Sequence, residues 1–325
     1  MYDIEKKPDR EPFQPVLGME EPIKLYSYQD RYGKRLQRLT VDGGFTCPNR
    51  DGSVSVGGCS FCDNAAFHPA YTLGKSITEQ LRAGVSFHGN RSRRADGYLA
   101  YFQPFSNTYA DVPTLLRRYE EALAFPGVCG LVIGTRPDCI DREKLRLLSD
   151  IKAQGHIVEL EFGIESVYDA TLRRVNRGHD FACTRRAFEM SAEAGLEAGG
   201  HIILGLPGET REMMVKAADV LNTLPVSFLK FHQLQIIKGT RMESEFSEKP
   251  GDFLRPGPEE YISILSDIIE RLRPDIAIGR IASSVPPRFT DSPWGLLRHD
   301  ELLRMLINGL KERQSCQGFR LIGHA

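Results

Sequence analysis

Short apolar segments alternate with amphipathic segments along most of the chain, and this alternation predicts its fold. Segments of strand length recur from residue 36 onward, and each is followed by a helical pattern or a loop. Repeated strand and helix units with short apolar strands form parallel sheets, and six such units curl into a partial barrel. The sequence therefore predicts an α/β fold, a partial (βα)6 barrel. Its strands are expected at residues 36–41, 98–102, 130–134, 157–162, 201–204 and 228–235.

Helix boundaries in this region carry recognisable capping signals. Ser76 and Glu79 have the spacing of a capping box, which predicts a helix over residues 77–87. Asp141 is expected to cap a later helix, which Gly155 ends. Other helices are predicted at residues 112–124, 181–194 and 210–224, with a short one after Ser166.

The pattern changes after residue 240, where prolines interrupt the alternation. An amphipathic helix around residues 261–272 follows them, then one more strand at 276–282 and a last helix that Asp300 is expected to cap. We interpret this part as a C-terminal α/β extension packed on the barrel. The expected division is therefore an irregular N-terminal lead-in (residues 1–30), the barrel (31–240) and the extension (241–325).

Composition narrows the class of protein. The chain has 325 residues, 41% of them hydrophobic, which is enough for a large core in one dominant domain. A formal net charge of −1 argues against a surface that binds nucleic acid or anionic lipid along its whole extent. No apolar run reaches the length of a membrane span, and residues 1–9 lack the apolar core of a signal peptide. We therefore expect a soluble cytoplasmic protein with no membrane partner.

Seven cysteines, an odd number scattered along the chain, indicate reduced thiols rather than a disulfide framework. Three of them, Cys47, Cys59 and Cys62, lie on one loop after the first predicted strand. α/β barrels place their active sites at this end of their strands. Three thiolates fit an iron–sulfur cube that keeps one iron open to a ligand, whereas a closed zinc site needs a fourth ligand. His68 would supply it, so a Cys₃His zinc site is the alternative.

The cysteine loop, with Phe61 between its last two cysteines, resembles that of the radical S-adenosylmethionine (radical SAM) superfamily. The eleven residues between Cys47 and Cys59 exceed the spacing usual in that superfamily. Other stretches follow the predicted strands in order and are similar to the branch with the Elongator catalytic subunit and oxygen-independent coproporphyrinogen oxidase. They are Thr-Arg-Pro-Asp at 135–138, Gly-Ile-Glu-Ser at 163–166, Asn-Arg-Gly-His at 176–179 and Gly-Leu-Pro-Gly at 205–208. The cysteine spacing and residues 279–288 most resemble the YhcC-like subgroup.

The resemblance implies a partial (βα)6 radical SAM barrel in which Cys47, Cys59 and Cys62 hold a [4Fe-4S] cluster. The enzyme would use the cluster to cleave S-adenosyl-L-methionine reductively to a 5′-deoxyadenosyl radical. The residues implied in cofactor binding are Phe61 near the adenine, Gln103 and Asn107 near the amino group, Arg177 near the carboxylate, and Arg136, Glu165, His201 and Gly205. Glu165 stands where the family usually has Gln. For Arg136 and His201 a structural role is the alternative.

Relatives in the wider branch act on the wobble uridine of tRNA, so the resemblance implies tRNA modification, with an electron donor such as flavodoxin or ferredoxin. A base must leave its stack to reach a barrel mouth, and its phosphates then need cationic partners. The basic residues expected to supply them are Lys34, Arg35, Arg38, Arg91, Arg93 and Arg94. Two alternatives stay open: a radical SAM enzyme with a small metabolite or protein substrate, and a noncatalytic iron–sulfur or zinc-binding protein.

Overall fold

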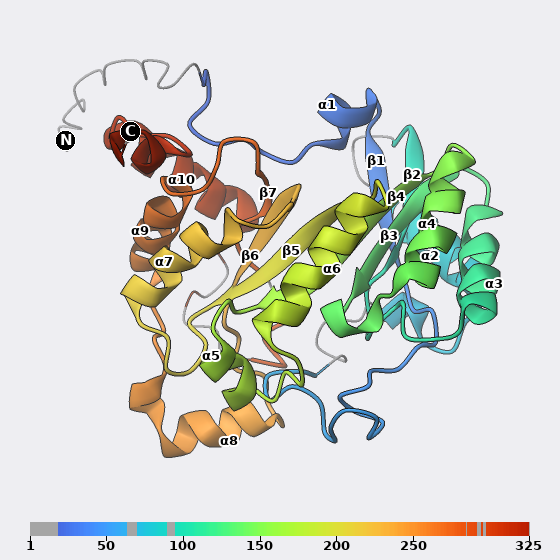
Figure 1. The fold of residues 1–325 in the computed structure, drawn as a ribbon, viewed down its shortest axis with the longest axis horizontal. Coiled ribbons are helices and arrows are strands. Elements are labelled where there is room, and N and C mark those ends of the chain that lie inside the picture. Colours follow the sequence, from blue (N-terminus) through green and yellow to red (C-terminus); the bar gives the residue numbers. More distant parts are fainter. Residues whose placement is uncertain are drawn as a thin grey trace, which may run out of the picture.

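A computed structural model describes residues 19–63, 70–89, 95–283, 285–290, 294 and 297–324. Its centre is one curled sheet in which every neighbouring pair of strands is parallel and the strands follow sequence order. Helices pack along the outer face of this half-barrel (Figure 1). The predicted α/β partial barrel is confirmed. The strands are β1 (Leu36–Val41), β2 (Gly97–Phe102), β3 (Val128–Thr135), β4 (Ile157–Glu165), β5 (Glu197–Leu204), β6 (Phe228–Gln233) and β7 (Ala277–Arg280).

The seventh strand changes the expected architecture at one edge. β7 comes from the C-terminal part of the chain, and it pairs in parallel with β6 instead of lying outside the barrel sheet. Residues before β1 reach the same edge, because Leu25 forms a parallel bridge with Ile278. The sheet is therefore one strand wider than the six-unit prediction. The division at residues 30 and 240 remains a prediction.

The helices between the strands begin where their capping signals predict. The Ser76 hydroxyl accepts from the amide of Glu79, and the Glu79 carboxylate accepts from the amide of Ser76, which completes the capping box. Asp141 caps its helix by accepting from the amide of Lys144. These helices are α2 (Ile77–Gly89), α3 (Val112–Leu123), α4 (Arg142–Ala153), α5 (Asp169–Arg174), α6 (Phe181–Glu193) and α7 (Arg211–Leu221).

The terminal parts differ more from the prediction. The cap of the last helix is Arg298, and Asp300 lies inside its first turn, so the predicted cap is wrong by two residues. The short helix α8 has no predicted counterpart, because Met242 is its one buried residue and leaves no apolar stripe. The helices here are α1 (Tyr28–Tyr32), α8 (Arg241–Glu248), α9 (Pro258–Ile269) and α10 (His299–Glu312), and 3₁₀ turns occur at Ala70–Thr72, Pro137–Cys139, Pro250–Asp252 and Phe319–His324.

The two faces of the sheet have opposite character. On β4, Leu160 and Phe162 are fully buried, and Phe162 packs edge to face on Phe188 of α6 with ring centroids 5.1 Å apart. The alternating residues Glu159 and Glu161 point the other way, because successive side chains of a strand leave opposite faces. The apolar core therefore lies between the sheet and its helices, and the interior of the half-barrel is polar.

Candidate functional site

The carboxyl ends of the strands surround a cavity of about 580 Å³, within the size range of small-molecule sites. The cysteine loop forms one side of this cavity, and inward side chains of β2, β4, β5, β6 and β7 form its walls and floor. The structure brings nine of the eleven predicted site residues to the cavity lining. They are Cys47, Cys59, Phe61, Cys62, Gln103, Arg136, Glu165, Arg177 and His201.

Backbone hydrogen bonds give the cysteine loop a defined shape. The carbonyl of Pro48 accepts from the amides of Val54 and Ser55, and the carbonyl of Asn49 accepts from Gly58. Gly58 has φ of +78°, a left-handed conformation that glycine adopts at little cost. The residues that lengthen the cysteine spacing thus form a compact turn beside the cavity.

Two donors lie next to the most buried of the three thiols. Asn49 Nδ2 and a terminal nitrogen of Arg177 are each 3.6 Å from Cys59 Sγ. Burial, with Cys59 close by, raises the pKa of Cys62 to about 11, so this thiol keeps its proton at neutral pH unless a cation binds. Hydrogen bonds to thiolate sulfurs are one way in which proteins tune iron–sulfur clusters. This donor set therefore fits a cluster held by thiolates.

Buried donors without partners test whether the cavity also fits an anionic ligand. One terminal nitrogen of Arg136 and Nε of Arg177 are buried and have no hydrogen-bond partner in the structure. Such groups cost free energy unless an acceptor reaches them, and both arginines line the cavity. The carboxylate of an amino-acid cofactor has acceptor oxygens of the required kind. These residues therefore fit S-adenosyl-L-methionine.

The zinc alternative depends on a residue that the structure does not describe. Among the described residues, no three His, Cys, Asp or Glu side chains converge on one point as a single metal ion requires. In a cube each thiolate binds a different iron, so its ligands need not converge in this way. His68, the fourth ligand of the Cys₃His reading, lies outside the described residues.

Arg136 has a structural partner as well as a place at the cavity. It donates to both oxygens of Asp138, at 2.8 and 2.7 Å, and to the carbonyl of Arg177 at 2.7 Å. Glu165 ends β4 with φ of +64°, a strained conformation for a non-glycine residue, and its carboxylate is 3.4 Å from Arg177. Arg136 is therefore paired with a carboxylate and also lines the cavity, and its role in binding a cofactor stays a prediction. Glu165 orients Arg177 at the cavity wall.

Asn107 and Gly205 are the two predicted residues that do not line the cavity. Asn107 is fully buried, and its amide nitrogen donates to the carbonyls of Phe102 and Gly134, so it fixes the loop after β2. Gly205 has φ of +92°, and an added Cβ would lie 2.7 Å from the Leu254 carbonyl oxygen. The structure thus gives both residues backbone roles away from the cavity lining, and their roles toward a cofactor stay predictions.

Substitution Gly205→Val is expected to lower the free energy of unfolding by about 3 kcal/mol or more, because it adds a positive-φ penalty to a backbone clash. Urea unfolding followed by circular dichroism measures this change. Gly155→Ala is the control, because it has φ of +93° with nothing near its added Cβ. Equal losses in the two variants would contradict the clash with Leu254.

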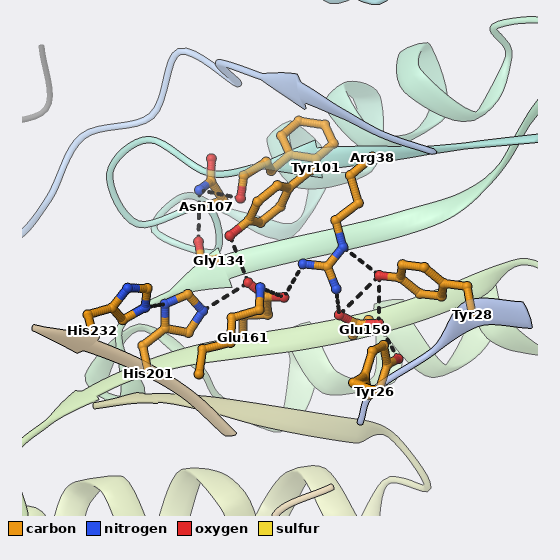
Figure 2. A network of polar contacts seen from close by, with 12 residues as sticks. Tyr26, Tyr28, Arg38, Tyr101, Asn107, Gly134, Glu159, Glu161, His201 and His232 are labelled. Carbon is orange, nitrogen blue, oxygen red and sulfur yellow. Dashed lines mark hydrogen bonds and ion pairs between the residues drawn. The ribbon is translucent and has the colours of Figure 1, made fainter. Parts of the chain in front are cut away.

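A network of charged side chains fills the barrel below the cavity (Figure 2). Glu161 is fully buried, and it accepts from Arg38 at 2.7 Å, from Tyr101 at 2.7 Å, and from Lys230. Burial alone would raise the pKa of Glu161, but Lys230 and Arg38 beside it hold that pKa well below its ordinary value. The sequence reading missed this network. The signal for it was the alternation of two glutamates with apolar residues along β4.

The same network closes the lower end of the barrel. The Tyr26 hydroxyl donates to Glu159 at 2.6 Å, and Arg38 donates to the Tyr28 hydroxyl at 2.6 Å and to Glu159 at 2.6 Å. Tyr26 and Tyr28 come from the segment before β1, part of the predicted lead-in. This segment therefore packs under the interior network and shields it from solvent.

The basic residues predicted for phosphate contact lie elsewhere. Arg38 is inside the barrel and bonded to two glutamates, so it does not serve as a surface cation. Lys34 and Arg35 precede β1, at the end of the sheet opposite the cysteine loop, about 20 Å away by strand geometry. Arg91, Arg93 and Arg94 lie outside the described residues. The predicted phosphate contact is therefore wrong for Arg38. The positions of Lys34 and Arg35 argue against the same contact for these two residues.

A parallel half-barrel with a three-cysteine loop at the carboxyl ends of its strands defines an α/β-barrel protein with a candidate thiolate site at its mouth. Comparison with known families agrees with this class. The model of the Radical SAM superfamily matches residues 47–221, more than half of the chain, and that of the Radical_SAM C-terminal domain matches residues 226–307. The chain belongs to the radical SAM superfamily of enzymes.

Relatives support the same assignment. Protein YhcC of Escherichia coli (strain K12) is 36% identical over 280 residues, which cover 84% of this chain and 89% of that protein. A tRNA uridine(34) acetyltransferase of Methanocaldococcus infernus is 26% identical over 159 residues, 48% of this chain and 29% of that protein. The solved structure of archaeal Elp3 from Methanocaldococcus infernus has a TM-score of 0.63 at 17% identity, covering 86% of this chain and 64% of that one. The likeness to that structure shows the fold.

The superfamily implies an iron–sulfur cluster and S-adenosylmethionine, and the cavity fits both groups. The resemblance to this superfamily and to YhcC-type proteins is confirmed. In the described part of the chain, no helix combines the length and the apolar character needed to cross a membrane.

Proposed function

We propose that the chain binds a [4Fe-4S] cluster through Cys47, Cys59 and Cys62 and cleaves S-adenosyl-L-methionine reductively. One observation carries this proposal: the three cysteines open onto the same cavity as the polar interior of the barrel. The bound cluster would supply one electron to the sulfonium, which yields methionine and a 5′-deoxyadenosyl radical. A flavodoxin or ferredoxin is the proposed source of that electron.

The chain's own residues then hold and orient the cofactors. Asn49 and Arg177 donate toward Cys59, and the unpaired nitrogens of Arg136 and Arg177 receive the carboxylate of the cofactor. Phe61, beside the cysteines, offers an apolar surface for the adenine. The closed lower end of the barrel excludes water from the interior, which protects a reactive radical.

The test is reductive cleavage by protein reconstituted with iron and sulfide under anaerobic conditions. We expect iron and sulfide in equal amounts, and formation of 5′-deoxyadenosine that depends on dithionite and S-adenosyl-L-methionine. Zinc in place of iron, or a cluster without any cleavage, would favour the noncatalytic alternative.

For the substrate we propose a uridine of tRNA. The relative described as a tRNA uridine(34) acetyltransferase and the Elp3 fold support this choice. Exposed basic side chains near the cavity support it as well: Arg241 donates to the Gly58 carbonyl of the cysteine loop, and Arg288 comes two residues after Pro286, which lines the cavity. Such cations at the cavity mouth suit phosphates that flank an extruded base.

Substitution Arg288→Gln is expected to weaken tRNA binding several-fold at low salt and to reduce the salt slope of log K by about one, because it removes one phosphate contact. Binding curves at several salt concentrations measure both effects. Arg35→Gln is the matched control, because Arg35 lies at the opposite end of the sheet. Equal effects of the two substitutions would contradict binding at the cavity mouth.

Mass spectrometry of tRNA nucleosides from cells with and without the protein identifies the modification. We expect one modified uridine to disappear without the protein. An unchanged nucleoside profile, together with no tRNA binding at low salt, would favour a small metabolite or a protein as substrate.

A further inference from the structure

Three side chains at the floor of the cavity form a hydrogen-bonded chain that the proposed cofactor chemistry does not use (Figure 2). Glu161 Oε2 is 2.9 Å from His201 Nε2, and His201 Nδ1 is 3.1 Å from His232 Nε2. The two imidazole rings stack with centroids 5.1 Å apart. Glu161, His201 and His232 all line the cavity, so the chain runs from the buried network to the open space.

The carboxylate at the buried end fixes where the protons of this chain lie. Arg38, Lys230 and Tyr101 all donate hydrogen bonds to Glu161. An ionised carboxylate can accept all of them, whereas a protonated carboxyl group has fewer acceptor positions. An ionised carboxylate only accepts hydrogen bonds. His201 must therefore carry its proton on Nε2, the nitrogen that faces Glu161.

Each histidine carries one proton, so the position of the second proton follows. Burial lowers the pKa of His201, and burial together with His201 lowers the pKa of His232 well below its ordinary value. A neutral His201 with its proton on Nε2 has a lone pair on Nδ1, which accepts from His232 Nε2. His232 Nδ1 is then left without a proton, as an acceptor at the cavity.

Two cationic side chains line the same cavity as this acceptor. Lys230 lies two residues earlier on the same face of β6, and Arg280, an exposed residue at the end of β7, also lines the cavity. The Lys230 ammonium has three protons and uses one for Glu161. Glu161 and Glu165 are the carboxylates facing the same space, and both have arginine partners. The cavity thus holds one acceptor, His232 Nδ1, together with two cationic side chains that can donate.

An acceptor at this position distinguishes uracil from cytosine. Uracil presents an N3–H donor between two carbonyl acceptors, so its N3–H complements the lone pair of His232 and its carbonyl oxygens can accept from cations in the same cavity. Cytosine has nearly the same shape but carries an acceptor at N3, which would face the lone pair of His232. A site built around a hydrogen bond rejects the analogue that lacks the matching group.

We propose that His232 Nδ1 accepts the N3–H of a uracil base at the floor of the cavity, with Lys230 and Arg280 donating to its carbonyl oxygens. His201 and Glu161 act as positioning residues, because they fix the tautomer of His232. This inference rests on the RNA substrate proposed above and names the part of the barrel that selects the base.

The test compares the binding of two anticodon stem-loop RNAs, with uridine or cytidine at the wobble position, to the reconstituted protein. Wild-type protein is expected to bind the uridine RNA about tenfold more tightly or better. His232→Gln retains a donor toward His201 but places no acceptor where Nδ1 was, so it should lose this preference. His232→Asn places its carbonyl oxygen near that position and should keep part of the preference. His156→Gln, just before β4 at the far end of the sheet, is the control and should bind as the wild type does.

The outcomes separate this inference from the function on which it rests. If wild-type protein binds both RNAs equally well, the RNA function stands and the uracil site is overturned. If neither RNA binds while S-adenosyl-L-methionine is still cleaved, the RNA substrate falls and the uracil site falls with it. Long-range ¹H–¹⁵N spectra of histidine-labelled protein test the tautomer directly, and a proton on His232 Nδ1 at pH 7 would overturn the inference whatever the RNA data show.

Discussion

Substitution Cys59→Ala is expected to reduce the reductive cleavage of S-adenosyl-L-methionine to background. Two remaining thiolates do not hold a cube whose fourth iron must stay open to the cofactor. Cys59 is 7% exposed, and Asn49 and Arg177 lie beside its sulfur, so its replacement also removes an acceptor from both side chains, although Asn49 Nδ2 still donates to the Asn176 carbonyl. Chromatography of 5′-deoxyadenosine measures cleavage, and iron and sulfide analysis measures cluster content. Cys47→Ala and Cys62→Ala share this expectation.

Cys129→Ala is the matched control for these three variants. Cys129 is a half-buried thiol near the start of β3, where its Sγ donates to the Tyr98 carbonyl at 3.3 Å, and it does not line the cavity. Cleavage by this variant should stay close to the wild-type rate. Full turnover by Cys59→Ala, or loss of the cluster in Cys129→Ala, would mean that the ligands are assigned wrongly.

Much of the fold follows from local patterns in the sequence. The apolar segments locate the strands of the half-barrel, and the caps at Ser76 and Asp141 form as predicted. The prediction weakened where structure depends on distant partners. β7 has four residues and owes its place to pairing with β6, and α8 has a single buried residue, Met242. The sequence predicts the strand at residues 276–282 but contains no signal for its pairing with β6, and α8 leaves no strong period.

The cavity residues divide in the same way. The cysteine spacing and the short motifs are local, and the residues that they indicate mostly line the cavity. The charged interior depends on contacts between residues that lie far apart in the sequence. Arg38 and Glu159 are 121 positions apart, and Lys230 and Glu161 are 69 positions apart. Arg38 also shows why a run of basic residues misleads, because Lys34 and Arg35 stay outside while the strand carries Arg38 inward. The pleat of β1 decides this, and the charge pattern does not contain it.

The interior network makes Glu161 the residue whose loss should cost most stability. Substitution Glu161→Leu is expected to lower the free energy of unfolding by about 3–5 kcal/mol, because it leaves the buried cations of Arg38 and Lys230 without their shared partner. Urea unfolding measures the loss. Glu197→Gln is the control: Glu197 is also a strand carboxylate paired with an arginine, Arg31, but its side chain is 41% exposed, so the expected loss is below about 1 kcal/mol.

A second substitution shows whether uncompensated charge causes the loss. Lys230→Met in the Glu161→Leu background removes one of the two cations, and Arg38 keeps its bond to Glu159, so the double variant should be more stable than Glu161→Leu alone. If the two substitutions instead add their separate losses, the damage comes from lost packing, and the network is not held together by its charges. A double variant with a higher free energy of unfolding than Glu161→Leu would mean that the barrel tolerates a more apolar interior. The buried ions would then serve the chemistry of the cavity more than the stability of the fold.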